Sequence, residues 1–126
     1  MKRVVSSQDA PSAVGAYSQA IATADLVFTA GQIPATPAGE LLDDESVAVQ
    51  TEQSIENVRA LLEAEDLGLD DVVKTTVYLD DIETFEEMND VYGDHFADDP
   101  PARSAIEAGA LPKGVGVEIE AIATRS

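Results

Sequence analysis

The chain has 126 residues and a net charge of −18, because 25 acidic residues stand against 7 lysines and arginines. So acidic a surface repels nucleic acids and anionic membranes, and we expect neither as a partner. The lack of cysteine excludes disulfides and thiolate chemistry, and a single histidine, His95, excludes a two-histidine metal motif. The length fits one domain over residues 1–126.

The acidic residues are spread along the whole chain rather than gathered in one tail. Dense negative charge is best tolerated where salt screens its self-repulsion. We therefore hypothesise adaptation to a high-salt cytoplasm, with an ordinary acidic protein as the alternative. No apolar run reaches membrane-spanning length, and the N-terminus lacks the apolar stretch of a signal peptide, so we expect a cytoplasmic location.

The first third of the chain predicts three strands. Residues 2–5 are a candidate edge strand, and a loop with Pro11 follows them. A second strand is expected within residues 15–21, and residues 26–30 form an apolar third one. Gly31 ends that strand, and a glycine at this point lets the backbone approach a ligand or another chain closely.

The middle of the chain predicts two helices on either side of a strand. Buried-face positions between residues 45 and 65 recur at helical spacing. Residues 72–79 are rich in β-branched side chains and are the clearest strand. Asp80 and Glu83 resemble a capping box that begins the second helix. The expected buried stripe of that helix comprises Ile82, Phe85, Met88, Tyr92 and Phe96.

Residues 100–123 predict a hairpin, with two strand-like runs around a turn that holds Gly109, Pro112 and Gly114. Apolar and polar residues alternate in the second run, as in a half-buried strand. Matching the apolar faces of the two runs sets the register, because a slip of one residue would bury polar groups. The matched pairs are Ile106 with Val115, Ser104 with Val117, and Arg103 with Glu118.

An arginine opposite a glutamate on paired strands has two interpretations. One is a surface ion pair that contributes about 1 kcal/mol or less. The other is a site in which Arg103 binds a small carboxylate with its planar fork and Glu118 orients or deprotonates a water. A guanidinium in that position is expected to lower the pKa of Glu118 and to make it a weaker base.

Four short motifs follow one another along the chain: Tyr17-Ser18-Gln19-Ala20, Gly31-Gln32-Ile33-Pro34, Pro101-Ala102-Arg103-Ser104, and Leu111-Pro112-Lys113-Gly114 through Glu118. Together they resemble the Rid family of reactive intermediate deaminases, in particular its RidA-like branch, also called the translation inhibitor or endoribonuclease L-PSP family. The resemblance runs from Ala10 to Ala123. The chain departs from the family pattern at Ala16, Ala30 and Ala105, where proline, serine and cysteine are common.

The resemblance implies a chorismate-mutase-like α+β fold, in which two helices cover one face of a mixed sheet of about six strands. It also implies a homotrimer with clefts between subunits. The implied activity is hydrolysis of 2-iminobutanoate and 2-iminopropanoate, released by pyridoxal-phosphate dehydratases, to 2-oxo acids and ammonia, with no metal or cofactor. Arg103 and Glu118 are the implied catalytic residues. The implied substrate-binding residues are Tyr17, Gly31, Asn89 and Ala105.

Several of these residues also have a structural interpretation. Tyr17 suits a strand aromatic in the core, Gly31 a loop glycine, and Asn89 a solvated helix residue. Two other functions stay open. One is a module that binds a small metabolite and reports to a partner, which Ala30 favours because it lacks a hydroxyl. The other is an endoribonuclease, which the acidity disfavours.

Overall fold

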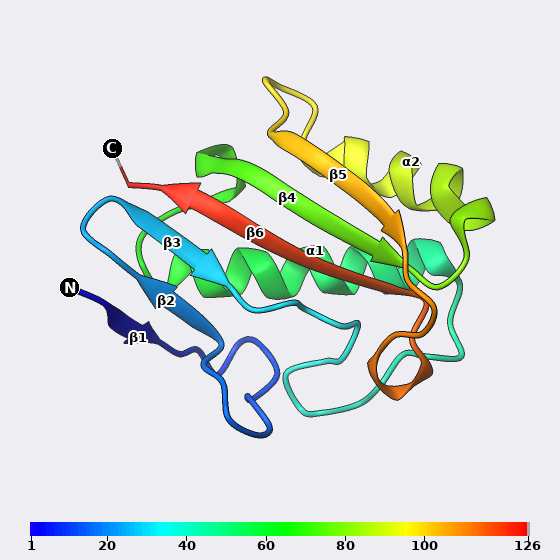
Figure 1. The fold of residues 1–126 in the computed structure, drawn as a ribbon, viewed down its shortest axis with the longest axis horizontal. Helices are drawn as coiled ribbons and strands as arrows, with labels where there is room; N and C mark the ends of the chain where they lie inside the picture. The colour runs from blue at the N-terminus through cyan, green and yellow to red at the C-terminus, as the bar shows by residue number, and fades with distance from the viewer. Residues whose placement is uncertain (126) are drawn as a thin grey trace.

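The computed structural model describes residues 1–125, which form a six-stranded mixed sheet and two α-helices (Figure 1). The strand order is β1-β2-β3-β6-β4-β5. This α+β architecture, with the strand and helix order along the chain, confirms the fold expected from the sequence. The elements are β1 (Arg3–Val5), β2 (Ala20–Ala22), β3 (Leu26–Thr29), α1 (Val47–Glu63), β4 (Val72–Leu79), α2 (Phe85–His95), β5 (Ala102–Glu107) and β6 (Val117–Thr124).

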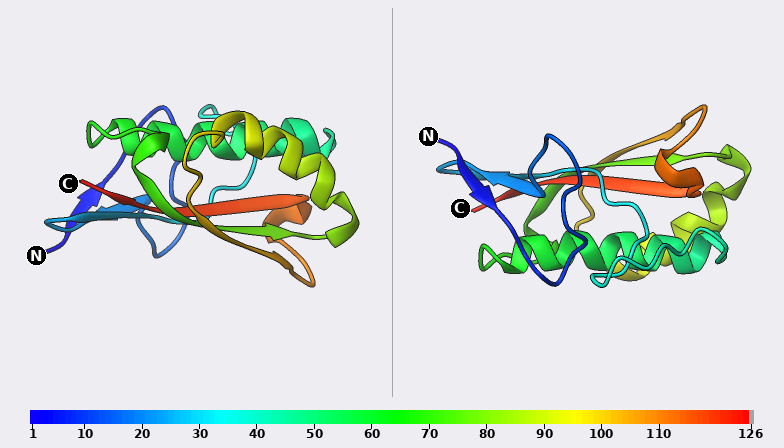
Figure 2. Two further views of the ribbon diagram at one scale, coloured as in Figure 1. Left: turned by 90° about the horizontal axis from the view of Figure 1, so that it is seen from above. Right: turned by 90° about the horizontal axis from the view of Figure 1, so that it is seen from below.

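Both helices lie on one face of the sheet, as the two side views of Figure 2 show. The alternation in β6 explains this arrangement. Val117 and Ile119 are buried beneath the helices, whereas Glu118 and Glu120, which alternate with them, are half-buried and point to the other side. The buried residues of α1, among them Ile55 and the leucines of its last turns, close the core from above.

The opposite face of the sheet carries no helix, and we call it the open face. An apolar row crosses four of its strands, because Val4 pairs with Ile21, Ile21 with Phe28, and Phe28 with Ile122. Val4 and Phe28 are exposed. Contiguous exposed apolar side chains are typical of a surface that another protein covers.

The hairpin predicted for residues 100–123 is wrong. Strand β4 lies between β5 and β6, pairing with β5 in parallel and with β6 in antiparallel register. The chain can enter β5 in parallel because α2 supplies the long crossover that such a pair needs. The end of β4 holds both flanks of the predicted turn: the Ala108 amide donates to the Leu79 carbonyl, and the Asp80 amide donates to the Gly116 carbonyl.

The helix starts differ in detail from the prediction. Ser46 caps α1, since its hydroxyl oxygen accepts from the Val49 amide at 3.2 Å. The expected capping box at Asp80 is wrong. Asp81 instead caps a short 3-10 helix, Ile82–Thr84, that leads into α2, and its carboxylate accepts from the Glu83 amide at 2.9 Å. Among the described residues, no helix has the length and apolarity needed to cross a membrane.

One carboxylate joins both ends of the described chain to the end of α1. Glu65 accepts two hydrogen bonds of 2.7 Å from Arg3, the first residue of β1, and one of 2.6 Å from Arg125 after β6. The Glu65 side chain is 9% exposed. Its two arginines hold its pKa at about 2, well below the ordinary value. The pair of arginines thus fixes the edge strand β1 and the end of the central strand β6 relative to the helix.

Candidate functional site

A pocket of about 650 Å³ opens at the C-terminal end of β3, between the loops around residues 11–19, 30–39 and 112–113. Tyr17, Gly31 and Glu118 all line it. Three of the six residues predicted to form the site therefore lie together. The other residues on its wall are Pro11, Ser12, Val14, Gln19, Ala30, Gln32, Ile33, Ala35, Pro37, Ala38, Gly39, Pro112 and Lys113.

Glu118 reaches the pocket because residue 31 has no side chain. A Cβ atom placed on Gly31 would overlap the Glu118 carboxylate. The next residue, Gln32, pairs with Ile119 of β6 through two backbone hydrogen bonds of 2.8 and 3.1 Å. This pairing brings the backbone of residue 31 against β6 directly beside Glu118, so the glycine is needed for the carboxylate to occupy this place.

The pKa of Glu118 is raised above its ordinary value, first by burial and then by the nearby Glu120 carboxylate. The expectation that Arg103 lowers this pKa is therefore wrong for the isolated subunit. Tyr78 of β4 is the residue in register with Glu118. Lys113 lines the pocket together with Glu118. A carboxylate with a raised pKa is a stronger base than an ordinary one.

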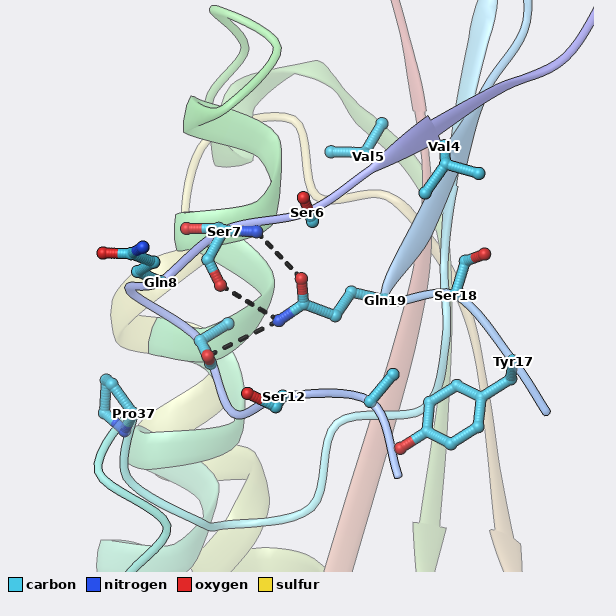
Figure 3. A pocket seen from close by; sticks show the side chains of 12 residues that line it. Val4, Val5, Ser6, Ser7, Gln8, Ser12, Tyr17, Ser18, Gln19 and Pro37 are labelled. Atoms are coloured by element: carbon cyan, nitrogen blue, oxygen red, sulfur yellow. Dashed lines mark hydrogen bonds between the residues drawn. The ribbon is translucent and has the colours of Figure 1, made fainter. Parts of the chain in front are cut away.

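Tyr17 lies in a loop before β2 and is 54% exposed, so its interpretation as a core aromatic is wrong. Its hydroxyl oxygen accepts from the Val14 amide at 3.3 Å. The ring forms a wall of the Glu118 pocket and also borders a neighbouring hollow of about 750 Å³ (Figure 3). An exposed aromatic ring at a pocket mouth is available to a ligand or to a second protein chain.

Gln19 holds the loop that carries these walls, a role that the sequence motif alone does not reveal. Its amide oxygen accepts from the Ser7 amide at 2.8 Å, and its amide nitrogen donates to the Pro11 carbonyl at 2.8 Å. Figure 3 shows the Gln19 side chain reaching from the residue just before β2 toward Ser7. Because Gln19 is buried and hydrogen-bonded from both ends, the loop over residues 7–11 is fixed against the sheet.

The remaining predicted residues lie at the β5 edge of the sheet. Arg103 donates from Nη1 to the Asn89 side-chain oxygen at 2.6 Å, so Asn89 of α2 is not simply a solvated helix residue. The Arg103 guanidinium carbon also lies 5.3 Å from the centre of the Phe85 ring and 4.7 Å from that of Tyr92. Ala105, two residues further along β5, shares the face of Arg103.

The predicted pairing of Arg103 with Glu118 is wrong, because the two residues lie on opposite faces of the sheet. Arg103 is in register with the buried Thr75, on the helix-covered face. Glu118 is in register with Tyr78, on the open face. The alternation of side chains across β4 thus separates them within one subunit. The six predicted site residues thus form two groups within one subunit. We call them the pocket half, with Tyr17, Gly31 and Glu118, and the edge half, with Asn89, Arg103 and Ala105.

Within residues 1–125, one group of side chains has metal-ligating chemistry: Glu52, Glu56 and His95 have ligand atoms within 4.8 Å of one another. His95 contacts the Glu52 carboxylate at 2.9 Å through Nε2, and Arg59 at 3.0 Å through Nδ1. Arg59 also lies 3.4 Å from Glu56. A guanidinium already occupies the place of a cation here, so this group ties α1 to the end of α2.

Comparison with proteins of known sequence finds relatives that match over nearly the full length. A RutC family protein of Pyrococcus horikoshii is 48% identical over 124 residues, covering 98% of both chains. A protein of Escherichia coli named 2-iminobutanoate/2-iminopropanoate deaminase is 42% identical over 129 residues, covering 99% of both.

Solved structures agree with the sequence relatives. The crystal structure of E. coli TdcF with bound serine superposes with a TM-score of 0.93 at 40% identity, covering 98% of this chain and 99% of that one. The model of the family described as endoribonuclease L-PSP matches residues 7–125. On this match and these identities, the chain belongs to the endoribonuclease L-PSP family, the Rid family that the four motifs resemble.

Proposed function

We propose that this protein is a 2-iminobutanoate/2-iminopropanoate deaminase, which hydrolyses reactive imines from pyridoxal-phosphate dehydratases to 2-oxo acids and ammonia. The observation that carries the proposal is the chemistry of the two halves. Arg103 is held ready for a carboxylate, and Glu118 is a half-buried carboxylate with a raised pKa in a pocket. A 2-imino acid presents a carboxylate and a cationic iminium on adjacent carbons, which matches this pair of charges.

The proposal requires a second subunit, because one chain keeps Arg103 and Glu118 on opposite faces of the sheet. We infer a homotrimer in which the edge half of one subunit meets the pocket half of its neighbour. The apolar row of the open face supports this assembly, since it offers a surface for another copy. Each trimer would then hold three equivalent clefts, one at each subunit boundary.

In the proposed reaction, Arg103 clamps the substrate carboxylate by charge-assisted hydrogen bonds. Glu118 takes a proton from a water as that water adds to C2 of the iminium, which gives a tetrahedral carbinolamine. Glu118 returns the proton to the nitrogen and then takes the hydroxyl proton as the C2–N bond breaks. The 2-oxo acid forms, and ammonia leaves with the proton as ammonium. An iminium carbon is already electrophilic, so the step needs no metal or organic cofactor.

The other predicted residues have supporting roles in this scheme. Asn89 fixes Arg103 from the helix side. Backbone groups of Gly31 and Ala105 would hold the imine nitrogen or the carboxylate, and Tyr17 would close the cleft. Ala30 lines the pocket without the hydroxyl that is common at this position in the family, so contacts to the substrate there are apolar.

A coupled assay tests the activity. A serine or threonine dehydratase generates the imine, and its decay is followed with wild-type protein, Arg103→Ala and Glu118→Gln, in multimolar salt and in low salt. We expect acceleration by the wild type and a large loss in both variants. Wild-type turnover by Arg103→Ala would overturn the site assignment. A folded protein that binds 2-oxobutanoate without accelerating decay would favour the metabolite-binding module instead.

A mixing experiment tests the shared cleft. Arg103→Ala and Glu118→Gln subunits are unfolded together and refolded, so that mixed trimers form. A cleft between subunits regains activity whenever an intact arginine meets an intact glutamate, in about a quarter of clefts in an equal mixture. If the site lay within one subunit, no mixture of the two variants would recover activity.

A further inference from the structure

The Arg103 guanidinium lies along one face of α2, over two aromatic rings that are two turns apart. Phe85 and Tyr92 contribute the rings, and Asn89 lies between them along the helix. The sequence assigns both rings to the buried core stripe, yet each contacts this cation. The negative face of an aromatic ring attracts a guanidinium and restricts its motion.

The Tyr92 ring is itself fixed from the neighbouring strand. Its hydroxyl lies 2.7 Å from the Thr75 hydroxyl, and Thr75 is buried. Thr75 is also the residue of β4 that is in register with Arg103 of β5. The three residues therefore contact one another in turn. Thr75 pairs with Arg103 between β4 and β5, the Thr75 hydroxyl contacts the Tyr92 hydroxyl, and the Tyr92 ring contacts the Arg103 guanidinium.

The second hydrogen-bonding edge of the guanidinium is left for a ligand. Asn89 takes one hydrogen bond from Nη1, and within residues 1–125 Arg103 forms no ion pair with a carboxylate. The aromatic contacts do not consume N–H donors, because they act on the flat face of the group. The planar fork therefore keeps donors for two parallel hydrogen bonds to a carboxylate.

We propose that Phe85 and Tyr92, with Thr75 behind Tyr92, are positioning residues that hold Arg103 in the orientation that binds the substrate carboxylate. This inference rests on the proposed function and names the residues behind its binding step. A long arginine side chain loses much rotamer freedom when it binds a ligand, and holding it beforehand removes that loss. The rings should therefore govern binding of the substrate more than the rate of the bound complex.

The experiment measures KM and kcat for imine hydrolysis, and the affinity for 2-oxobutanoate by calorimetry, on the full chain. Phe85→Leu and Tyr92→Leu each remove one ring. Each should raise KM about tenfold and weaken the affinity for 2-oxobutanoate about tenfold, while kcat changes about twofold or less. Tyr92→Phe keeps the ring, so we expect a smaller effect, about threefold or less.

Phe96→Leu is the matched control. Phe96 is buried, and its ring centre lies 4.6 Å from that of Tyr92, but no contact joins it to Arg103. It should lower the melting temperature about as much as Tyr92→Leu and leave KM at the wild-type value. Should Tyr92→Leu fail to fold, Phe85→Leu still tests the inference, because Phe85 is only partly buried.

A spectroscopic measurement follows the arginine directly. The side-chain Nε–H proton of Arg103, assigned by its loss in Arg103→Lys, should be shifted upfield by the rings in the wild type and less so in the ring variants. Wild-type KM and affinity in both ring variants, or an equal loss in Phe96→Leu, would overturn the positioning role while the deaminase proposal stands. If the wild type neither hydrolyses imines nor binds 2-oxobutanoate, the proposed function and this inference both fail.

Discussion

The two halves of the site differ in how their charged groups are surrounded. Glu118 lines a pocket, and its pKa is raised first by burial and then by the nearby Glu120 carboxylate. Arg103 lies against a neutral amide and two aromatic rings, and no carboxylate of the described residues pairs with it. Each half thus holds an uncompensated charge, and a substrate with a carboxylate beside a cationic carbon would compensate both.

Glu65 shows what this fold does to a carboxylate that has its arginines in the same subunit. With Arg3 and Arg125 bound, its pKa is about 2, while that of Glu118 is shifted in the opposite direction. Glu65 is consequently structural and chemically quiet at neutral pH. Within one subunit no arginine of the described residues pairs with Glu118, and burial, with the Glu120 carboxylate second, raises its pKa instead.

The largest effect is expected from Glu118→Gln, which keeps the size of the side chain and removes its proton transfer. We expect kcat for imine hydrolysis to fall about a thousandfold, while the affinity for 2-oxobutanoate changes little. Stopped-flow decay of the imine and calorimetry measure the two quantities. An equal loss in binding and in kcat would show that Glu118 contributes to carboxylate binding instead, and would break the division of roles between the halves.

Gly31→Ala should produce the next largest effect, because its Cβ would overlap the Glu118 carboxylate. We expect kcat to fall roughly tenfold to a hundredfold as the carboxylate is displaced. Gly93→Ala is the control, since a Cβ on Gly93 meets no atom within 4 Å. Wild-type kcat in Gly31→Ala would contradict the place assigned to Glu118.

Glu120→Gln should move the pH profile rather than the maximal rate. Glu120 is the second cause of the raised pKa of Glu118, after burial, so removing its charge should lower that pKa. A base works when deprotonated, and the loss of kcat/KM on acidification should therefore begin at a lower pH in the variant. The matched measurement is the profile of Glu107→Gln, whose carboxylate lies at the end of β5 and accepts from the Ile82 amide. A shift toward higher pH in Glu120→Gln would be inconsistent with the proposed coupling.

Glu65→Gln should affect stability alone, and by the smallest amount, on the order of 1–2 kcal/mol for lost charge-assisted hydrogen bonds near the surface. A lowered pKa stabilises the fold above the unfolded-state value, and this contribution is lost as pH falls toward about 2. Denaturant unfolding at pH 7 and at pH 2.5 should show a difference from wild type that shrinks in acid. The exposed neighbour Glu63→Gln should show none. A change in KM in Glu65→Gln would contradict its assignment as purely structural.

Much of the fold follows from local patterns in the sequence. The β-branched run predicted as a strand over residues 72–79 is β4 to the residue, and helical spacing identifies α1 within two residues at each end. Alternation in β6 correctly separates Val117 and Ile119 from Glu118. These features depend on the burial of one face of a single helix or strand. The spacing of apolar residues along the sequence encodes that face.

The sequence also contains a signal for the contacts of Arg103 with α2. Phe85, Asn89 and Tyr92 are spaced by four and three residues, which places them on one face of a helix. Read separately, the aromatics suit the core and the asparagine suits solvent. The strand that brings Arg103 over this face is β5, and its place in the sheet is not apparent from the helix.

Three things were decided by the tertiary structure. The predicted hairpin of residues 100–123 is wrong because β4 lies between β5 and β6. The alternation of apolar and polar residues shows which face of a strand is buried, but it does not show which strand lies beside it. The opposite faces of Arg103 and Glu118 follow from this position of β4. The raised pKa of Glu118 follows in turn, because burial and charge proximity depend on contacts between residues far apart in the chain. The sequence alone determined the residue types, the elements and the family, since these depend on local order.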